Sequence, residues 1–212
     1  MIAFLLSLTA LIAYGMGSLR TDIIVSNFFL HKNLMNYTRD NIGITRFERD
    51  FGWKGFAAIL ITEVLKTLIP VILGGILLGI KDQGDIGRAF ALFCVMLGTR
   101  FPIMYGFVGE RSLIVMAVGI LCMNAGMGIL VIALFAAVYR ITRYISLASL
   151  VSTAFMYMLT LILLDGAWVH RLMLLCAVIV LIEYRKNIVR LIKKTEPKFI
   201  YRRDLSYMFD EK

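Results

Sequence analysis

The sequence predicts an all-α integral membrane protein with about seven transmembrane helices, its N-terminus outside and its C-terminus in the cytoplasm. Of the 212 residues, 60% are hydrophobic and 17% are charged, and the mean hydropathy is +0.82. A soluble domain is about half apolar and about a quarter charged. The apolar residues also gather in runs near the roughly 20 residues that a spanning helix needs. Lipid is therefore the expected solvent for most of the chain.

Six apolar runs follow one another along the chain, and each predicts one or more membrane helices. They cover residues 2–19, 55–80, 88–98, 112–139, 144–164 and 167–183. The first run is preceded by no basic residue and followed by no convincing small-residue cleavage site, which a secretory signal would have. We expect it to be a retained membrane helix.

The charges between the runs predict the membrane face of each connection. Three basic connections are expected in the cytoplasm, at about residues 20–54, 99–111 and 140–146. The charge-balanced turn at 81–88 and the short Asp165-Gly166 turn are expected outside. The tail from Arg185 carries nine basic and four acidic residues and is expected inside. Residues 1–185 thus form one transmembrane domain, followed by a basic cytoplasmic tail at 186–212.

The run at 112–139 decides the number of helices. Basic residues flank both of its ends, so both ends are expected on the cytoplasmic face and the run crosses an even number of times. A turn at Met123-Asn124-Ala125-Gly126 would split it into two short helices and give seven in all. One tilted helix through the whole run would give six.

Charge and cysteine content exclude several classes of function. The net charge of +9 would suggest nucleic acid in a soluble protein, but these basic residues lie where the membrane rule expects them, so no nucleic-acid partner is predicted. The three cysteines each lie inside an apolar run without metal spacing, and there are two histidines. We therefore expect no protein-built metal site and no cofactor.

Two ionisable residues fall inside the second run. Glu63 and Lys66 are three residues apart and share one helix face. They are either a mutually neutralising pair that holds the bundle together or part of a polar site, which intramembrane charges commonly mark.

Three polar loops are expected on the cytoplasmic face. Asn41-Ile42-Gly43-Ile44-Thr45, followed by Arg46 and Arg49, combines a glycine turn, a hydroxyl and guanidinium groups. These groups suit a phosphate, although anionic lipid headgroups would fit them equally well. Residues 98–112 form the second loop, and residues 142–149 the third, whose hydroxyls are candidates to cap the next helix. Together they predict a site for an anionic, lipid-linked substrate.

The polar motifs also occur in a recognisable order. They are Gly17-Ser18; Thr38 to Arg46, with Arg49 and Gly52; Glu63 to Thr67, with Pro70; Gly98 to Pro102, with Gly106, Phe107, Gly109 and Arg111; Arg143, Tyr144, Ser146, Leu147 and Ser149; and Arg185, Asn187, Ile188, Arg190 and Leu191, with Glu196 beyond. In this order the chain, from Tyr14 to about Glu196, resembles the PlsY-type acyl-phosphate:glycerol-3-phosphate acyltransferases of bacteria.

The resemblance implies a seven-helix enzyme of phospholipid synthesis in the bacterial cell membrane. Such an enzyme moves an acyl group from acyl phosphate to the 1-hydroxyl of glycerol 3-phosphate and forms lysophosphatidic acid. Its partners would be these two substrates and the bilayer. No catalytic residue is assigned, and the residues expected to bind or support the phosphates are Asn41, Gly43, Thr45, Arg49, Lys66, Arg111, Ser146 and Asn187.

Several positions depart from the family pattern. In the first loop Thr38-Arg39 replaces Gly-Ser, and Arg46 replaces the final Asn. In the second loop Thr99 replaces a histidine, and Glu110-Arg111-Ser112 replaces Gly-Lys-Gly. These changes favour a second hypothesis, a catalytically degenerate paralogue that binds lipid or regulates a partner acyltransferase. A small transporter is a third hypothesis, which rests only on Glu63 and Lys66 and has no inverted repeat to support it.

Overall fold

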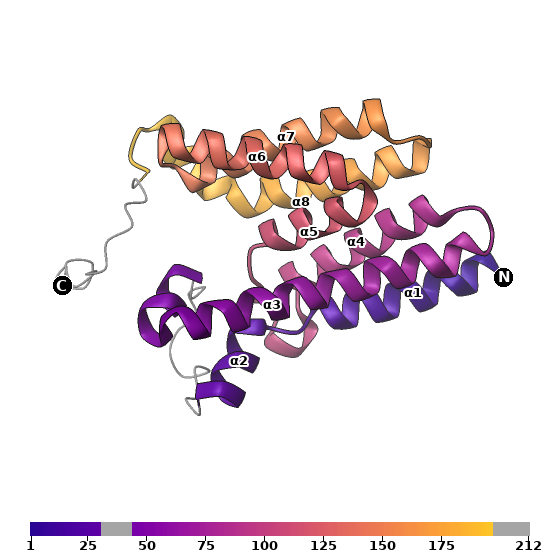
Figure 1. Ribbon diagram of the computed structural model, residues 1–212, viewed down its shortest axis with the longest axis horizontal. Coiled ribbons are helices and arrows are strands. Elements are labelled where there is room, and N and C mark those ends of the chain that lie inside the picture. The colour runs from indigo at the N-terminus through magenta and orange to yellow at the C-terminus, as the bar shows by residue number, and fades with distance from the viewer. Residues whose placement is uncertain (31–43, 197–212) are drawn as a thin grey trace.

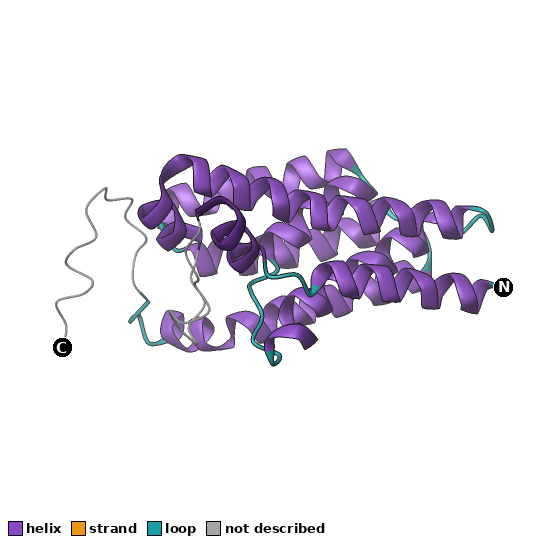
Figure 2. Cartoon of the chain, turned by 90° about the horizontal axis from the view of Figure 1, so that it is seen from below, coloured by secondary structure: helices purple, strands orange, loops and turns teal. Residues whose placement is uncertain are grey.

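The chain forms an elongated bundle of helices that run along its long axis (Figures 1 and 2). The computed structural model describes residues 1–30 and 44–196, with side chains at 1–25 and 57–196. No strand occurs in these ranges. The helices are α1 (Ile2–Gly17), α2 (Thr21–Leu30), α3 (Ile44–Gly79), α4 (Gly84–Arg100), η2 (Ile103–Tyr105), α5 (Leu113–Met123), α6 (Ala125–Thr142), α7 (Ile145–Leu163) and α8 (Ala167–Ile192).

Seven apolar helices in the described part of the chain confirm the predicted all-α membrane fold. Five segments are long and apolar enough to cross a bilayer, in α3, α4, α6, α7 and α8. The shorter apolar helices are α1 and α5. The first described residue and the end of α8 lie at opposite ends of the bundle (Figure 1). That arrangement agrees with an odd number of passes, whereas the assignment of each end to a membrane face stays a prediction.

The predicted break in the long apolar run is confirmed, and it falls at Asn124. This residue ends α5 and caps α6, because its side-chain oxygen accepts a hydrogen bond from the Met127 amide at 3.0 Å. A Cβ on Gly128 would lie 2.5 Å from Leu121 Cδ2, so a glycine there lets α6 turn back closely along α5. Helix α5 is short for a bilayer and packs on the longer helices α3, α4 and α6, whereas α6 is long enough to cross.

The expected cytoplasmic connections contain more helix than the sequence suggested. Helix α2 and the start of α3 occupy much of the 20–54 segment, and the α6–α7 connection is reduced to Arg143 and Tyr144. Helix α8 continues past the expected domain boundary at 185 and ends at Ile192. The length of an apolar run indicates where a helix leaves the membrane. The helix itself can continue into water, because its backbone hydrogen bonds persist as long as the residues there are compatible with a helix.

Glycines bring α4 very close to α1 and α3. A Cβ on Gly17 would lie 2.4 Å from the Val95 carbonyl oxygen, and one on Gly98 would lie 2.5 Å from that of Tyr14. Gly74 of α3 meets Gly87 of α4 in the same way. Small residues allow such approach between membrane helices, where dispersion contacts replace the hydrophobic effect as the driving force. The packing fixes the ends of α1 and α4 side by side.

Candidate functional site

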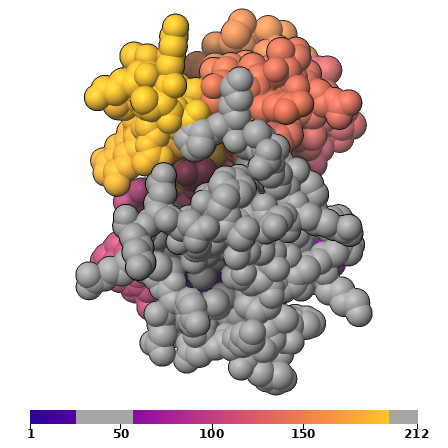
Figure 3. Space-filling model, turned by 90° about the vertical axis from the view of Figure 1, so that its left-hand side faces the viewer, coloured from indigo at the N-terminus to yellow at the C-terminus, as the bar shows by residue number. Residues whose placement is uncertain are grey.

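Polar side chains gather at one end of the bundle, the end that the charge pattern places in the cytoplasm. Five segments reach it: the α1–α2 connection, the first part of α3, the loop from 101 to 112, the start of α7 and the end of α8 (Figure 1). Figure 3 views this end, with α6 and the end of α8 at its top. All described residues of the predicted site lie here.

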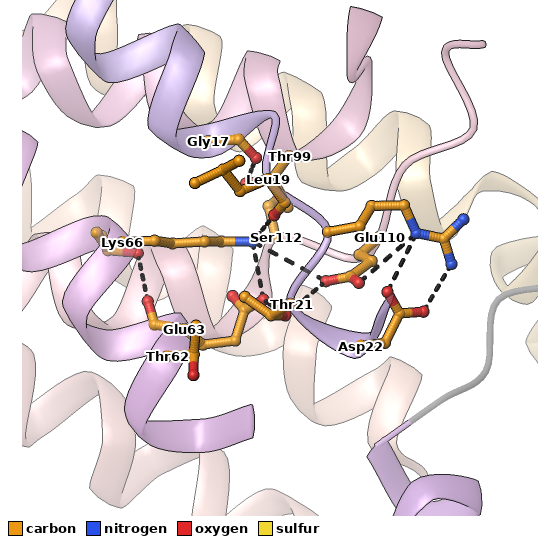
Figure 4. Close-up of polar contacts among 12 residues, drawn as sticks. Gly17, Leu19, Thr21, Asp22, Thr62, Glu63, Lys66, Thr99, Glu110 and Ser112 are labelled. Atoms are coloured by element: carbon orange, nitrogen blue, oxygen red, sulfur yellow. Dashed lines mark hydrogen bonds and ion pairs between the residues drawn. The ribbon is translucent and has the colours of Figure 1, made fainter. Parts of the chain in front are cut away.

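The ion pair inside α3 forms as the sequence predicted, and it is also part of a larger polar cluster. Lys66 Nζ lies 2.8 Å from Glu63 Oε1, and both residues are 3% exposed. The Thr21 hydroxyl donates a hydrogen bond to Glu63, and Lys66 donates to the Leu19 carbonyl at 3.3 Å (Figure 4). The start of α2 therefore solvates a pair that would otherwise be costly to bury. The two interpretations of the pair are compatible.

Two more carboxyl groups complete this first cluster. Arg20 donates to Asp22 through Nη2 at 2.6 Å and through Nε at 3.2 Å. Glu110 reaches in from the loop, with Oε2 3.9 Å from Lys66 Nζ and Oε1 3.9 Å from Arg20 Nε (Figure 4). Its backbone amide is held by the Thr99 carbonyl at 3.0 Å. The Arg20–Thr21–Asp22 stretch, Glu63, Lys66 and Glu110 are called the inner cluster below.

Burial and charge separate the pKa values of the two loop carboxyls. Burial raises the pKa of Glu110 well above its ordinary value, and the neighbouring Asp22 carboxylate raises it further. Burial acts in the same direction on Asp22, but hydrogen bonding to Glu110 and Arg20 outweighs it and leaves the pKa of Asp22 lowered. Of the two carboxyls, Glu110 is therefore the one that takes up a proton more readily.

The next residues of the same loop contact α8 instead. The Ser112 hydroxyl donates to Glu183 Oε1 at 2.7 Å, and the Ser112 amide also donates to that carboxylate. The Arg111 guanidinium lies over the Tyr184 ring, 5.1 Å from its centroid. The Tyr184 hydroxyl lies at hydrogen-bond distance, 3.1 Å, from the Ser149 hydroxyl of α7. One loop thus joins α3 and α8, with Glu110 turned to the inner cluster and Arg111 turned to the other side.

Ser146 and Asn187 meet through a shared carboxylate. Glu196 Oε1 accepts from the Ser146 hydroxyl at 2.7 Å and from the Asn187 side-chain amide at 2.8 Å. Tyr144 is the N-cap of α7 and its side chain makes no capping hydrogen bond, so Ser146 and Ser149 do not cap this helix, whereas the Thr142 hydroxyl accepts a hydrogen bond from the Tyr144 amide at 3.3 Å. Ser149 instead donates back to the Ile145 carbonyl at 2.8 Å.

The structure brings the described site residues to one face but not into one contact. Lys66 lies in the inner cluster, Arg111 lies against Tyr184, and Ser146 and Asn187 share Glu196. Asn41 and Gly43 lie outside the described residues. Thr45 and Arg49 fall in the first turns of α3, at positions where the structure describes the backbone alone. Thr99, which stands where the family has histidine, is buried and donates to the Gly17 carbonyl at 3.3 Å.

Sequence reasoning missed Arg20, Asp22 and Glu183 as site residues. Arg20 and Asp22 directly follow the matched Gly17-Ser18 pair, and that adjacency was the available signal. Glu183 lies at the end of the last apolar run and gave no signal of its own. No group of three or more histidine, cysteine or acidic side chains suited to a metal occurs in the part of the chain whose side chains are described.

The fold and this charged end define a multi-pass membrane protein with a site suited to anions. A family model described as glycerol-3-phosphate acyltransferase matches residues 7–194. The chain is 27% identical over 191 residues to the glycerol-3-phosphate acyltransferase of Thermoanaerobacter sp. (strain X514), covering 90% of this chain and 94% of that one. It is 32% identical over 186 residues to the one of Francisella tularensis subsp. mediasiatica (strain FSC147), covering 88% and 89%.

Solved structures of one fold relative agree. The crystal structure of the integral membrane glycerol 3-phosphate acyltransferase PlsY in its glycerol 3-phosphate form is similar with a TM-score of 0.78 at 20% identity, covering 97% of this chain and 99% of that one. Its lysophosphatidic acid form also gives 0.78 at 20% identity, covering 92% and 95%. The chain belongs to the glycerol-3-phosphate acyltransferase family, which confirms the resemblance drawn from its motifs. It is a multi-pass protein of the bacterial plasma membrane and a member of an acyltransferase family of phospholipid synthesis.

Proposed function

We propose that this protein transfers an acyl group from acyl phosphate to the 1-hydroxyl of glycerol 3-phosphate and releases lysophosphatidic acid and inorganic phosphate. The observation that carries the proposal is the convergence of the family-matched residues at one end of the bundle. Lys66, Arg111, Ser146 and Asn187 come from different helices or loops, and each contacts a neighbour that reaches this end. The names of the relatives and the forms in which PlsY was solved support the same reaction.

The site supplies two cationic centres for two phosphate-bearing substrates. Arg20 and Lys66 form the first, beside the inner cluster of carboxyls. Arg111 forms the second, and it is exposed at the edge of the loop. Guanidinium and ammonium groups fixed in place stabilise phosphate charge without reorganising during the reaction. In this proposal the first centre binds the acceptor phosphate and the second binds the phosphate of the donor.

The chemistry is a direct transfer between the bound substrates. The acceptor hydroxyl oxygen attacks the acyl carbonyl carbon and forms the ester bond. The bond from that carbon to the phosphate oxygen breaks, and the phosphate leaves with the electron pair and takes up the hydroxyl proton. The protein contributes position and charge stabilisation, which together account for large rate effects in such reactions.

The described residues offer little support for an acyl-enzyme route. The one histidine among them, His170, bonds to the Leu164 carbonyl at 2.8 Å near the opposite end of α8. Ser146 and Ser149 are committed to Glu196 and to Tyr184. In the proposed site Ser146 and Asn187 support the end of α8 through Glu196, and Asn41, Gly43, Thr45 and Arg49 complete the phosphate contacts.

The test is acyl transfer by purified, detergent-solubilised protein with palmitoyl phosphate and labelled glycerol 3-phosphate. Arg111→Ala should abolish product formation because the donor loses its cationic partner. Arg171→Ala is the matched control, since Arg171 also lies over an aromatic ring, 4.9 Å from the Trp168 centroid, but at the far end of α8. It should retain activity.

The outcomes distinguish an active acyltransferase from a family member that has lost this activity. Product that is lost in Arg111→Ala and kept in Arg171→Ala supports the proposal. No product from folded wild-type protein would overturn it and favour a catalytically degenerate paralogue that binds lipid or regulates a partner acyltransferase. The comparisons give that alternative no support of their own.

A further inference from the structure

We propose that this protein takes up one proton as the phosphate of its acceptor enters the inner cluster, and that Glu110 is the residue that holds it. The inference rests on the proposed function, because it takes glycerol 3-phosphate as the ligand of that cluster. It concerns Glu110 of the loop between α4 and α5.

The charges of the inner cluster do not balance when every carboxyl is ionised. Two cations, Arg20 and Lys66, face three carboxyls. Each cation already has a close carboxylate partner, Asp22 at 2.6 Å and Glu63 at 2.8 Å. Glu110 is the third carboxyl, and its two distances to these cations are 3.9 Å. It is the carboxyl that the cluster holds most loosely.

The surroundings of Glu110 favour its protonated form. Its Oε1 atom is buried and accepts no hydrogen bond in the structure. Asp22 is the neighbouring carboxyl, and two carboxyl groups share a hydrogen bond only when one of them carries a proton. Burial and the charge of Asp22 raise the pKa of Glu110 well above its ordinary value, in agreement with this geometry.

The titratable and charged groups around Glu110 come from the α1–α2 connection, α3 and η2. They are Arg20 and Asp22 from the α1–α2 connection, Glu63 and Lys66 from α3, and Tyr105 of η2, whose ring lies 5.9 Å from the Arg20 guanidinium carbon. The adjacent Arg111 is turned to Tyr184.

A phosphate that enters this cluster favours the protonated form of Glu110. A glycerol 3-phosphate dianion beside an ionised Glu110 would place two like charges between the same pair of cations. A protonated Glu110 removes that repulsion and can donate a hydrogen bond to a phosphate oxygen, so Arg20 and Lys66 attract the ligand without competition from a third carboxylate. Binding and protonation are therefore coupled, and the affinity falls as the pH rises.

The proton can be counted by isothermal titration calorimetry with glycerol 3-phosphate, without acyl donor. Titrations near pH 8, where the phosphate is largely dianionic because its second pKa is about 6, are run in buffers of different ionisation enthalpy. The wild type should take up about one proton per ligand, and its dissociation constant should rise about tenfold per pH unit between the pKa of Glu110 in the free protein and its higher pKa in the complex.

Two variants and a control make the result specific. Glu110→Gln and Glu110→Gly should bind with a proton uptake near zero and with little dependence on pH over the same range. Asp85→Asn removes an exposed carboxylate at the other end of the bundle, where Asp85 pairs with Arg88 at 2.9 Å, and it should behave as the wild type.

The outcomes also separate this inference from the proposed reaction. No proton uptake by the wild type, or equal uptake by wild type and Glu110→Gln, would overturn the role of Glu110 even if product forms. Coupled binding with no acyl transfer would leave the role of Glu110 intact and overturn the reaction. Absence of any binding of glycerol 3-phosphate to folded protein would overturn both.

Discussion

Removing the lysine of the buried ion pair should destabilise the protein far more than removing both partners. Lys66→Met leaves the Glu63 carboxylate 3% exposed without the ammonium that lies 2.8 Å away. An uncompensated buried charge costs about 3–5 kcal/mol. In the double variant Glu63→Gln/Lys66→Met no charge is left, and the glutamine amide oxygen still accepts the hydrogen bond that Thr21 donates to Glu63. Exchange of a whole buried pair for neutral residues is often close to neutral in stability.

A double-mutant cycle measures this difference directly. Unfolding in detergent micelles, followed by circular dichroism, should give a coupling energy of about 2–3 kcal/mol for Glu63 and Lys66. The matched control is Asp85 and Arg88, a pair with the same spacing at 2.9 Å whose side chains are 59% and 40% exposed. Exposed pairs are worth about 0–1 kcal/mol. Additivity of the Glu63 and Lys66 substitutions within about 0.5 kcal/mol would refute the idea that the two residues stabilise the fold as a coupled ion pair.

Three further predictions concern packing, pH and the end of α8. Gly98→Ala should destabilise the fold by about 1–3 kcal/mol in detergent unfolding followed by circular dichroism, because its Cβ would lie 2.5 Å from a carbonyl oxygen of α1. The control Gly15→Ala, whose Cβ would have nothing within 4 Å, should be neutral in the same assay. Glu110→Gln should match the wild-type stability at acid pH and exceed it increasingly as the pH rises through the raised pKa of Glu110, because the wild type then buries an ionised carboxyl; equal stability at all pH values would contradict this. Ser146→Ala and Asn187→Ala should each increase proteolysis after residue 192, since each removes one bond to Glu196, and unchanged cleavage would exclude that tether.

The fold could be predicted because lipid imposes a length and a composition on each helix. The apolar runs gave the seven helices, and Asn124 could be recognised as a break because its side chain caps a helix in the structure as it does in soluble proteins. Helix α2 and the extension of α8 to Ile192 could not be recognised from hydropathy. Hydropathy indicates which part of a helix lies in lipid, but it does not indicate where the helix itself begins or ends.

The sequence predicted candidate site residues but not the contacts among them. Lys66 was expected either in a neutralising pair with Glu63 or in a polar site, since a charge inside an apolar run needs a partner, and in the structure it does pair with Glu63. The partners from other elements, Thr21, Asp22 and Glu110, depend on how α1, α3 and the 101–112 loop meet. Local sequence gives no signal for how these elements pack together. Their packing depends on the glycines that allow α4 to lie very close to α1 and α3.

The loop after α4 fixes the spacing between the two proposed cationic centres. Gly109 lies so close to α4 that a Cβ on it would be 2.1 Å from the Thr99 carbonyl oxygen, and Ser112 is bonded to Glu183 of α8. The short segment between these two anchors holds only Glu110 and Arg111, which are turned to opposite sides. A shift of α8 relative to α4 would therefore move both side chains at once. Because acyl transfer requires the acceptor hydroxyl and the donor carbonyl to meet within about 3–3.5 Å, a rigid two-residue spacer between the two phosphate centres is the element on which the proposed reaction geometry depends most.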